Sequence, residues 1–515
     1  MLDFSKLRTP AADGDVLVEP SPTEWIEALR VNRKVLQSAR VPLLGSTLAQ
    51  WRSQTRERIV GRDDRPIVTI GHQPDFIHAG VWAKHVVARR FADAIDGDAL
   101  NLIVDTDSPR TASLAVPLVK AGGTTICRVT FSEPPAGRAF EQMRRISPDE
   151  RVRIAEEVKK CLADRYTDSL MSAFLDGLGA ELAQDWVDQC SAGRRAVDTS
   201  LGFVLDDRRV SRLWWAPFLR DVLSNVERFA ASYNRALAGY RREHHIRGAR
   251  RPIPDLAREG GAVEVPFWAY RRGDHRRRVF ASRTGVAVIL LADQESIGRF
   301  HLQDTAAWDE LASLLGDERS WRLRPRALAL TLWARLFLAD LFLHGIGGAK
   351  YDRISDAIIA DYYGLAPPQM VCVSATLRLA SPHTDSMPHA INSMQRSIRD
   401  LEWNPQRHLS DGGDSEALKR RRASVVLRSA ELRERSPGDR IARREAFEEI
   451  RRSNQALLAT RPGLLASRRA ELNRVLAELP HHRVALDREY FYALHSRAAL
   501  DRLAGSLPHE RDFGV

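Results

Sequence analysis

Cysteine is scarce in this sequence, with four residues in a chain of 515. Cys127, Cys161, Cys190 and Cys372 stand singly, and no CxxC pair offers the spacing of a structural zinc site. The sequence also contains no HExxH or similar metal-binding triad. These absences exclude a zinc-stapled fold and predict a protein whose cysteines are reduced.

Long apolar segments are also absent. The opening segment, MLDFSKLRTPAADGD, has no basic stretch followed by an apolar one. No later apolar run approaches the roughly 20 residues that span a bilayer. We therefore expect a soluble, cytoplasmic protein with no membrane partner.

Positive charge is in surplus, with 78 basic against 67 acidic residues and a net charge of +11. Such a surplus favours anionic partners such as phosphorylated metabolites, nucleotides, nucleic acid or a membrane surface. An arginine-rich composition can also reflect genomic composition. No basic motif interleaved with aromatic residues indicates nucleic-acid binding, so the expected partner is a small anionic molecule.

The chain is too long for one ordinary core, and its length predicts two or three domains. A β-favouring run at 66–70, a helical pattern to residue 95 and the apolar run LNLIVDTD at 100–107 together have the size of a βαβ unit. A second α/β passage at 323–379 contains the strand-like runs LFLHGIGG and QMVCVSAT. We expect both passages to form one Rossmann-like parallel sheet.

Other regions separate or follow these two passages. Residues between them are mainly helical at first and then β-rich, which predicts an inserted domain. After the DGGDS segment at 411–415, apolar residues recur at helical intervals, with breaks near Pro437, Pro462 and Pro480. The first half of the Rossmann-like core is predicted at residues 1–140 and its second half at 321–410. An insertion of helices and antiparallel strands is predicted at 141–320, and a helical coiled-coil arm at 411–515.

A candidate anion site follows the first predicted strand, in GHQPDFIHAG at 71–80. Gly71 permits a tight turn, while His78 and Gly80 would lie at a helix N-terminus whose unpaired amides and dipole attract anions. Phosphate or carboxylate is the expected ligand. The same predicted binding site includes His72, Gln73 and Lys84.

Two further turns carry candidate binding residues. Ser374, Thr376 and Arg378 follow a predicted strand, where hydroxyls and a guanidinium fork suit phosphate oxygens. The turn HGIGGAKYD adds another glycine-rich connection, although a tight structural turn explains its glycines equally well. Its predicted binding residues are His344, Gly347, Gly348 and Lys350. Anion sites at several strand ends favour a nucleotide.

Two carboxylates lie between these turns in sequence. Asp105 and Asp107 are two residues apart, so both could point the same way at a strand end. They are candidate ligands for a Mg²⁺ that carries phosphates, or a candidate base for an attacking amine. The alternative is that each caps a turn or a helix.

These residues carry two family resemblances. GHQPDFIHAG with VSATLR resembles the HxGH and ISSTxxR pair of nucleotidylyltransferases, which bind ATP phosphates on a Rossmann-like sheet. A wider resemblance, strongest at 323–379, is to the bacillithiol biosynthesis cysteine-adding enzymes. That family is similar in the order of its motifs, which here are Gly71 and Gln73, Asp105 and Asp107, LRPRAL, Gly347 and Gly348, YYGLAPP, SATL and a helical tail.

The second resemblance implies a ligase-like enzyme that joins a small acid or amino acid to an amine of a sugar or phosphorylated acceptor. His78 and the amides near Gly80 would stabilise developing negative charge, and Asp105 or Asp107 would act as base or metal ligand. ATP and Mg²⁺ are the candidate cofactors, and the arm implies a homodimer. Two alternatives remain open, which are adenylyl transfer from ATP and a non-catalytic basic adaptor.

Overall fold

The computed structural model describes residues 4–109, 111–120, 123–133, 137–162, 168–248, 253–312, 320–379, 387–410, 414–436 and 439–514. The chain divides into two compact units. The first unit comprises Met1–Val116, Cys127–Leu379 and Arg488–Val515, and the second comprises Pro117–Ile126 and Ala380–Asp487. The fold is mixed α/β, as the sequence predicts.

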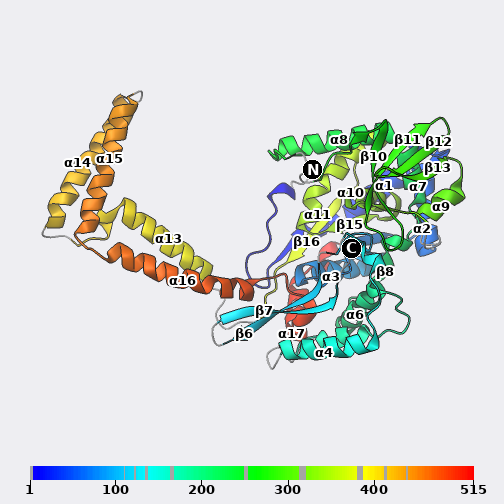
Figure 1. Cartoon of the computed structure of the whole chain (residues 1–515), viewed down its shortest axis with the longest axis horizontal. Coiled ribbons are helices and arrows are strands. Elements are labelled where there is room, and N and C mark those ends of the chain that lie inside the picture. Colours follow the sequence, from blue (N-terminus) through cyan, green and yellow to red (C-terminus); the bar gives the residue numbers. More distant parts are fainter. Residues whose placement is uncertain are drawn as a thin grey trace. The chain divides into compact units, whose positions relative to one another are not determined.

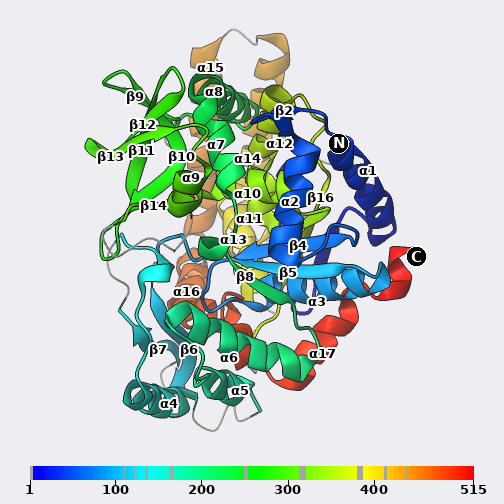
Figure 2. The ribbon, with the colours of Figure 1, turned by 90° about the vertical axis from the view of Figure 1, so that its right-hand side faces the viewer.

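The main sheet of the first unit has six strands in the order β1-β16-β15-β4-β5-β8 (Figure 2). All neighbouring strands are parallel except β1, which runs antiparallel to β16. The strands are β1 Val16–Glu19, β4 Ile67–His72, β5 Asp98–Ile103, β8 Asp206–Arg209, β15 Leu341–His344 and β16 Met370–Ala375. The expectation that both α/β passages form one parallel sheet is therefore confirmed.

The helix that connects β4 to β5 is buried on most of its sides. This helix, α3, spans Ala79–Ala94, and twelve of its sixteen residues are buried. Because most of its positions are apolar or glycine, the helix can pack against the sheet and against other helices at once. Further helices of the first unit are α1 Trp25–Gln37, α2 Leu48–Val60, α10 Ala327–Trp333, α11 Ile346–Tyr351, α12 Arg353–Ile358 and α17 Arg497–Ser506.

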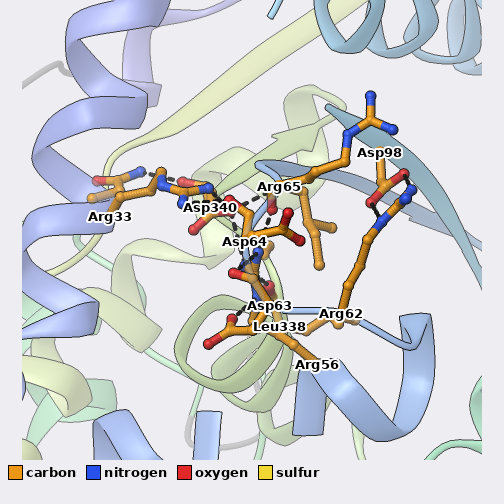
Figure 3. A network of polar contacts seen from close by, with 12 residues as sticks. Arg33, Arg56, Arg62, Asp63, Asp64, Arg65, Asp98, Leu338 and Asp340 are labelled. Atoms are coloured by element: carbon orange, nitrogen blue, oxygen red, sulfur yellow. Dashed lines mark hydrogen bonds and ion pairs between the residues drawn. The ribbon is translucent and has the colours of Figure 1, made fainter. Parts of the chain in front are cut away.

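Buried arginines fix the amino ends of β4 and β15 through Asp340. Arg56 donates from Nη1 to Asp340 Oδ2 over 2.8 Å, and Arg52 donates from Nη2 to Oδ1 over 2.7 Å. The Ile67 amide donates to the same carboxylate over 2.8 Å, and Figure 3 shows Arg33 and Arg56 directed toward it. Burial lowers the pKa of Arg52 to about 10, which is still far above neutrality. This network therefore closes the end of the sheet opposite the candidate site.

Residues 141–320 were predicted as an insertion, and most of them form helices and an antiparallel sheet. That sheet has the order β13-β12-β11-β10-β14, with β9 beside β10. One strand of the region differs, because β8 joins the main sheet parallel to β5. The elements are α4 Pro148–Leu162, α5 Met171–Gly177, α6 Trp186–Leu201, α7 Ala216–Ser224, α8 Val226–Glu243, β9 Arg258–Glu259, β10 Ala262–Tyr270, β11 Arg277–Thr284, β12 Ala287–Ala292, β13 Glu295–His301, α9 Thr305–Ala312 and β14 Arg322–Pro325.

The remaining strands form two sheets of two strands each. β2 Pro42–Leu43 pairs with β3 Ser46–Thr47, and β6 Ala112–Lys120 pairs with β7 Gly123–Ser132. Cys127 of β7 and Cys161 of α4 form a disulfide, with Cα atoms 6.1 Å apart. The expectation that all four cysteines are reduced is therefore wrong in this structure, because folding brings two of them together across 34 residues of sequence.

The segment Ala380–Asp487 of the second unit is helical, with α14 and α15 packed side by side and α13 beside α16 (Figure 1). Its helices are α13 Met387–Trp403, α14 Asp414–Arg435, α15 Arg440–Ala459 and α16 Leu464–Leu486. The break expected near Pro462 is present, the one at Pro437 lies outside the described residues, and α16 continues through Pro480. The unit starts before the predicted boundary at 411, and residues from Arg488 onward return to the first unit.

None of the helices in the described ranges combines the length and the apolar character that crossing a membrane requires.

Candidate functional site

The strand order places the candidate site at the carboxyl ends of β4 and β15. From β4 the chain proceeds outward to β5 and β8, whereas the later strands β15 and β16 lie on the other side of β4. Ligands of open α/β sheets bind in the crevice outside the carboxyl ends of the strands where the order reverses in this way. His72 ends β4 and His344 ends β15, so both predicted histidines lie at this point.

Lys84, which is buried, and His72, which is partly buried, lie near each other at the carboxyl end of β4. Lys84 of α3 is 3% exposed and donates from Nζ to the Gly71 carbonyl over 3.1 Å. Burial lowers the pKa of Lys84 to about 8. Burial and the nearby charge of Lys84 also lower the pKa of His72 to about 3, so this imidazole is neutral at physiological pH. Its Nδ1 donates to the Gln73 carbonyl over 3.2 Å.

Arg194 of α6 is a site residue that the sequence did not single out. It is 3% exposed, and its Nε and Nη2 have no hydrogen-bond partner among the residues that the structure describes. Its charge reaches both His72 and Asp75, because it helps to lower the pKa of each. The charges of Asp198 and Asp207 act against the burial and raise the pKa of Arg194, so its charge is compensated. Its two free donors are still costly to bury, so an anion or water is expected beside them.

One sequence signal could have identified Arg194. Along α6, Cys190, Arg194 and Asp198 recur every four residues, and all three are buried. A charged residue within such a buried stripe must have a partner or a function. Helical periodicity alone does not indicate which groups the stripe faces, and Arg194 is connected to the site by the effect of its charge on His72 at the end of β4.

His344 is held in a fixed orientation at the end of β15. Its Nε2 donates to Asp352 Oδ2 over 3.0 Å, and Arg335 donates to the same oxygen over 2.7 Å. Burial acts against ionisation, yet Arg335 and His344 hold the pKa of Asp352 below its usual range. A Cβ at Gly348 would lie 2.8 Å from His344 Nδ1, so the ring requires glycine there.

The other two residues predicted in this turn have a less defined role. A Cβ at Gly347 would meet no atom within 4 Å, so the space around it does not require glycine. Lys350 is half-buried on α11. These observations fit the structural explanation of the turn for Gly347 and leave the binding role of Lys350 a prediction.

The expected anion site at the start of α3 needs correction. His78 is the N-cap residue, and its Nδ1 accepts the hydrogen bond of the Gly80 amide over 3.1 Å. The Val81 amide donates to the His78 carbonyl over 2.9 Å, and the Tyr492 amide donates to the Ile77 carbonyl over 2.9 Å. The chain therefore uses the Gly80 and Val81 amides itself, although the sequence predicts them to be unpaired.

The turn after β16 lies next to this helix start, as expected. A Cβ at Gly80 would lie 2.5 Å from the Ala375 carbonyl oxygen, so the two backbones approach closely. Within the turn, however, Thr376 Oγ1 donates to the Pro10 carbonyl over 2.7 Å. Arg378 Nη2 donates to the Ala11 carbonyl over 2.6 Å, and Ser374 is buried in β16. Thr376 and Arg378 therefore hold the segment near Pro10 in this structure.

The two predicted carboxylates face different partners. Asp105 is fully buried and accepts from Arg209 Nε over 2.7 Å and from the Ser211 amide over 2.9 Å. Burial raises the pKa of Asp105, while Arg209 opposes that rise. Asp107 instead accepts from Gln73 Nε2 over 2.6 Å and from Arg276 Nη1 over 2.8 Å. The two carboxylates, which the sequence predicts could point the same way, therefore share no hydrogen-bond partner in this structure.

This geometry does not fit a metal held by the protein alone. Within the described ranges no group of three or more histidine, cysteine, aspartate or glutamate side chains could hold a metal ion. Asp105 is committed to Arg209 and Ser211, and Asp107 also accepts from the Ser108 amide over 2.8 Å, as in the turn-capping alternative.

Comparisons with known proteins add no relative. No protein-family model matches the chain, and no curated protein sequence matches it. The fold and the site therefore define the class on their own: an α/β protein with two buried cationic side chains, Lys84 and Arg194, near the point where its strand order reverses.

Proposed function

We propose that the protein is a ligase-like enzyme with a Rossmann-like core, which binds an anionic small molecule at the ends of β4 and β15. It joins a small acid or amino acid to an amine, as the similarity to the bacillithiol cysteine-adding enzymes implies. The order β8-β5-β4-β15-β16 supports the Rossmann-like assignment, because it corresponds to the 3-2-1-4-5 order of dinucleotide-binding sheets. Location in the cytoplasm is part of the same proposal.

The observation that carries the proposal is Arg194. Its Nε and Nη2, which have no hydrogen-bond partner among the described residues, offer two parallel donors. Two parallel donors match the two oxygens of a carboxylate or phosphate. Lys84 supplies a second positive charge in the same buried region, and neutral His72 supplies a hydrogen-bonding group. An anion bound there gains strength because little water competes for it.

The remaining predicted residues take roles that fit their contacts. Asp107 is 39% exposed at its side chain and bonded to Gln73, so we assign it, rather than Asp105, as the base for the attacking amine. ATP would activate the acid, and a Mg²⁺ bound to its phosphates needs no site made by the protein alone. His78 positions the start of α3.

The second unit is proposed to be the coiled-coil arm of a homodimer. Its helices carry exposed apolar residues, including Leu427 at 65% and Ile441 at 74% exposure. Such side chains are the ones that pairing with a second arm would cover. Sedimentation equilibrium tests this part, and a monomer at all concentrations would contradict it.

Replacement of Arg194 by methionine tests the proposed site. Arg194→Met removes two buried donors that have no hydrogen-bond partner among the described residues, so we expect ligand binding to be lost. The free energy of unfolding should fall, because Asp198 and Asp207 lose a compensating charge. A purely structural arginine would give the loss of stability without a loss of binding. Arg497→Met is the control, because Arg497 is 57% exposed and pairs only with Asp501 at 3.6 Å among the described residues.

The reaction itself is tested with ATP, Mg²⁺, amino acids and amine acceptors, with products identified by mass spectrometry. An amide product that depends on Arg194 supports the ligase. Release of pyrophosphate with a nucleotidylated acceptor would favour adenylyl transfer. Salt-sensitive binding to many nucleic-acid sequences, without any product and without dependence on Arg194, would favour the adaptor.

A further inference from the structure

β8 is the last strand at one edge of the main sheet (Figure 2). A pocket of about 480 Å³ is lined by residues of this strand and of the segment after it. Its walls come from the end of α2, from α6 with the segment before it, and from the chain between Asp207 and Trp214. Small-molecule pockets typically enclose roughly 300–1,000 Å³, so this one has room for a metabolite. None of the residues of the proposed active site lines it.

The lining is rich in arginine. It contains five arginines and two aspartates, which are Arg58, Arg195, Arg208, Arg209, Arg212, Asp188 and Asp207. Each arginine also has a carboxylate partner in or beside the wall. A bound anion would therefore depend on the guanidinium nitrogens that these carboxylates leave free or hold only loosely. Arginine is also the residue best suited to pair with phosphate groups.

Arg209, one of these arginines, is held in place by several hydrogen bonds. The Arg209 side chain is 6% exposed, and its Nε is bonded to Asp105. Its Nη1 donates to Asp185 Oδ2 over 2.8 Å and to Asp188 Oδ1 over 2.7 Å. Its Nη2 has no hydrogen-bond partner in the part of the chain that the structure describes. Three carboxylates already surround this guanidinium, so Nη2 is the donor that it could offer to a ligand without a change of position.

Two arginines at the rim are only loosely held. Arg58 lies 3.9 Å from Asp309, and Arg195 lies 3.7 Å from Asp207, both beyond hydrogen-bond distance. Their side chains are 56% and 49% exposed. Exposed pairs at such separations contribute little to stability, so either side chain can turn toward a ligand at small cost.

An apolar wall faces these charges. Ile59, Ile103, Leu213 and Trp214 line the pocket, and the Arg58 guanidinium lies 4.6 Å from the centre of the Trp214 ring. A phosphate ion alone would leave this wall uncovered. The geometry points to a small organic molecule with two or more phosphate groups, whose apolar or aromatic body packs against Trp214. This site is separate from the proposed active site and does not depend on the reaction proposed above.

Calorimetric titration of the full chain with ATP at low salt tests this inference. Arg58→Glu/Arg195→Glu reverses two rim charges, and we expect it to weaken one ATP-binding event at least about tenfold. Arg497→Glu is the matched control, with 57% side-chain exposure and a loose partner, and it should bind as the wild type does. Circular dichroism verifies folding, and Arg58→Gln/Arg195→Gln serves in its place if the charge reversal prevents folding.

The expected binding is distinguishable from binding at the active site. The Arg194→Met variant should still bind ATP at the pocket beside β8, even if it no longer binds a ligand at the proposed active site. Failure of the ligase proposal would therefore leave this inference standing. AMP should bind at least about tenfold more weakly than ATP, because it carries fewer phosphate charges. Three results would each overturn the inference. The first is that the double variant binds ATP as the wild type does, the second is equal affinity for AMP and ATP, and the third is no ATP binding by the wild type.

Discussion

Asp105 and Arg209 form a buried ion pair, with Arg209 Nε donating to Asp105 Oδ2 over 2.7 Å. The pair joins the segment after β5 to the end of β8, and Ser211 completes the coordination of the carboxylate. Both carboxylate oxygens are therefore in use. Asp105 holds the edge of the sheet together, and its contacts leave the proposed proton transfer to Asp107.

Replacement of Asp105 by asparagine should destabilise the protein strongly. The change removes one of the negative charges that compensate the buried charge of Arg209. Loss of one partner of a buried ion pair costs about 3 kcal/mol or more. Urea unfolding gives the free energy directly. Asp107→Asn is the control, because its half-exposed carboxylate should cost about 1 kcal/mol or less. Equal losses for the two variants would contradict the assignment.

Gly80 should tolerate no side chain. In Gly80→Ala the new Cβ would lie 2.5 Å from the Ala375 carbonyl oxygen, so α3 must move away from β16. Overpacking of this kind costs about 1–3 kcal/mol, which thermal or urea unfolding measures.

The control for Gly80→Ala is Gly347→Ala. Gly347 is helical, and its Cβ would meet no atom within 4 Å. Alanine is favoured over glycine in a helix by about 1 kcal/mol, so this variant should be neutral or more stable. A harmless Gly80→Ala would show that the close approach of helix and strand is not required.

The sequence predicts the central strands well because their signal is local. The runs that become β4, β5, β15 and β16 are apolar and end at turn residues, and such patterns depend little on distant contacts. By contrast, β8 consists of Asp-Asp-Arg-Arg and has no apolar pattern. It becomes a strand through pairing with β5 and through the Arg209–Asp105 contact, which a local pattern cannot indicate.

Part of the site could also be predicted, because some of its residues have a local sequence signal. Glycines and histidines at strand ends are visible in sequence, and His72 and His344 do lie where the strand order reverses. Arg194 lies more than 100 residues from β4 in sequence, and only the packing of α6 brings its charge to His72. The occupied amide of Gly80 was missed because it depends on the orientation of the His78 ring.

Stability should rise with pH because of Lys84. Burial lowers its pKa in the folded protein to about 8, against 10.5 for an ordinary lysine. Between these values the unfolded chain binds more protons than the folded one, so the free energy of unfolding increases with pH. The contribution is about 2 kcal/mol between about pH 7.5 and 9.5.

The measurement compares urea unfolding of the wild type and Lys84→Met across this pH range. The difference between the two proteins should change by the amount contributed by Lys84, since their other titrating groups are shared. Parallel pH profiles would show that Lys84 titrates as an exposed lysine does. An anion that pairs with Lys84 should shift the rise to higher pH, because it stabilises the charged form.

The disulfide between Cys127 and Cys161 should contribute measurably to stability. It closes a loop across 34 residues of sequence, and the chain-entropy relation gives a contribution of roughly 4 kcal/mol for a loop of that length. A reductant should therefore lower the free energy of unfolding of the wild type and leave that of Cys127→Ser/Cys161→Ser unchanged. Thiol titration of the denatured wild type should find two free thiols before reduction, from Cys190 and Cys372, and four afterwards. Four thiols before reduction would show that the pair is open in solution and that the prediction of reduced cysteines holds there.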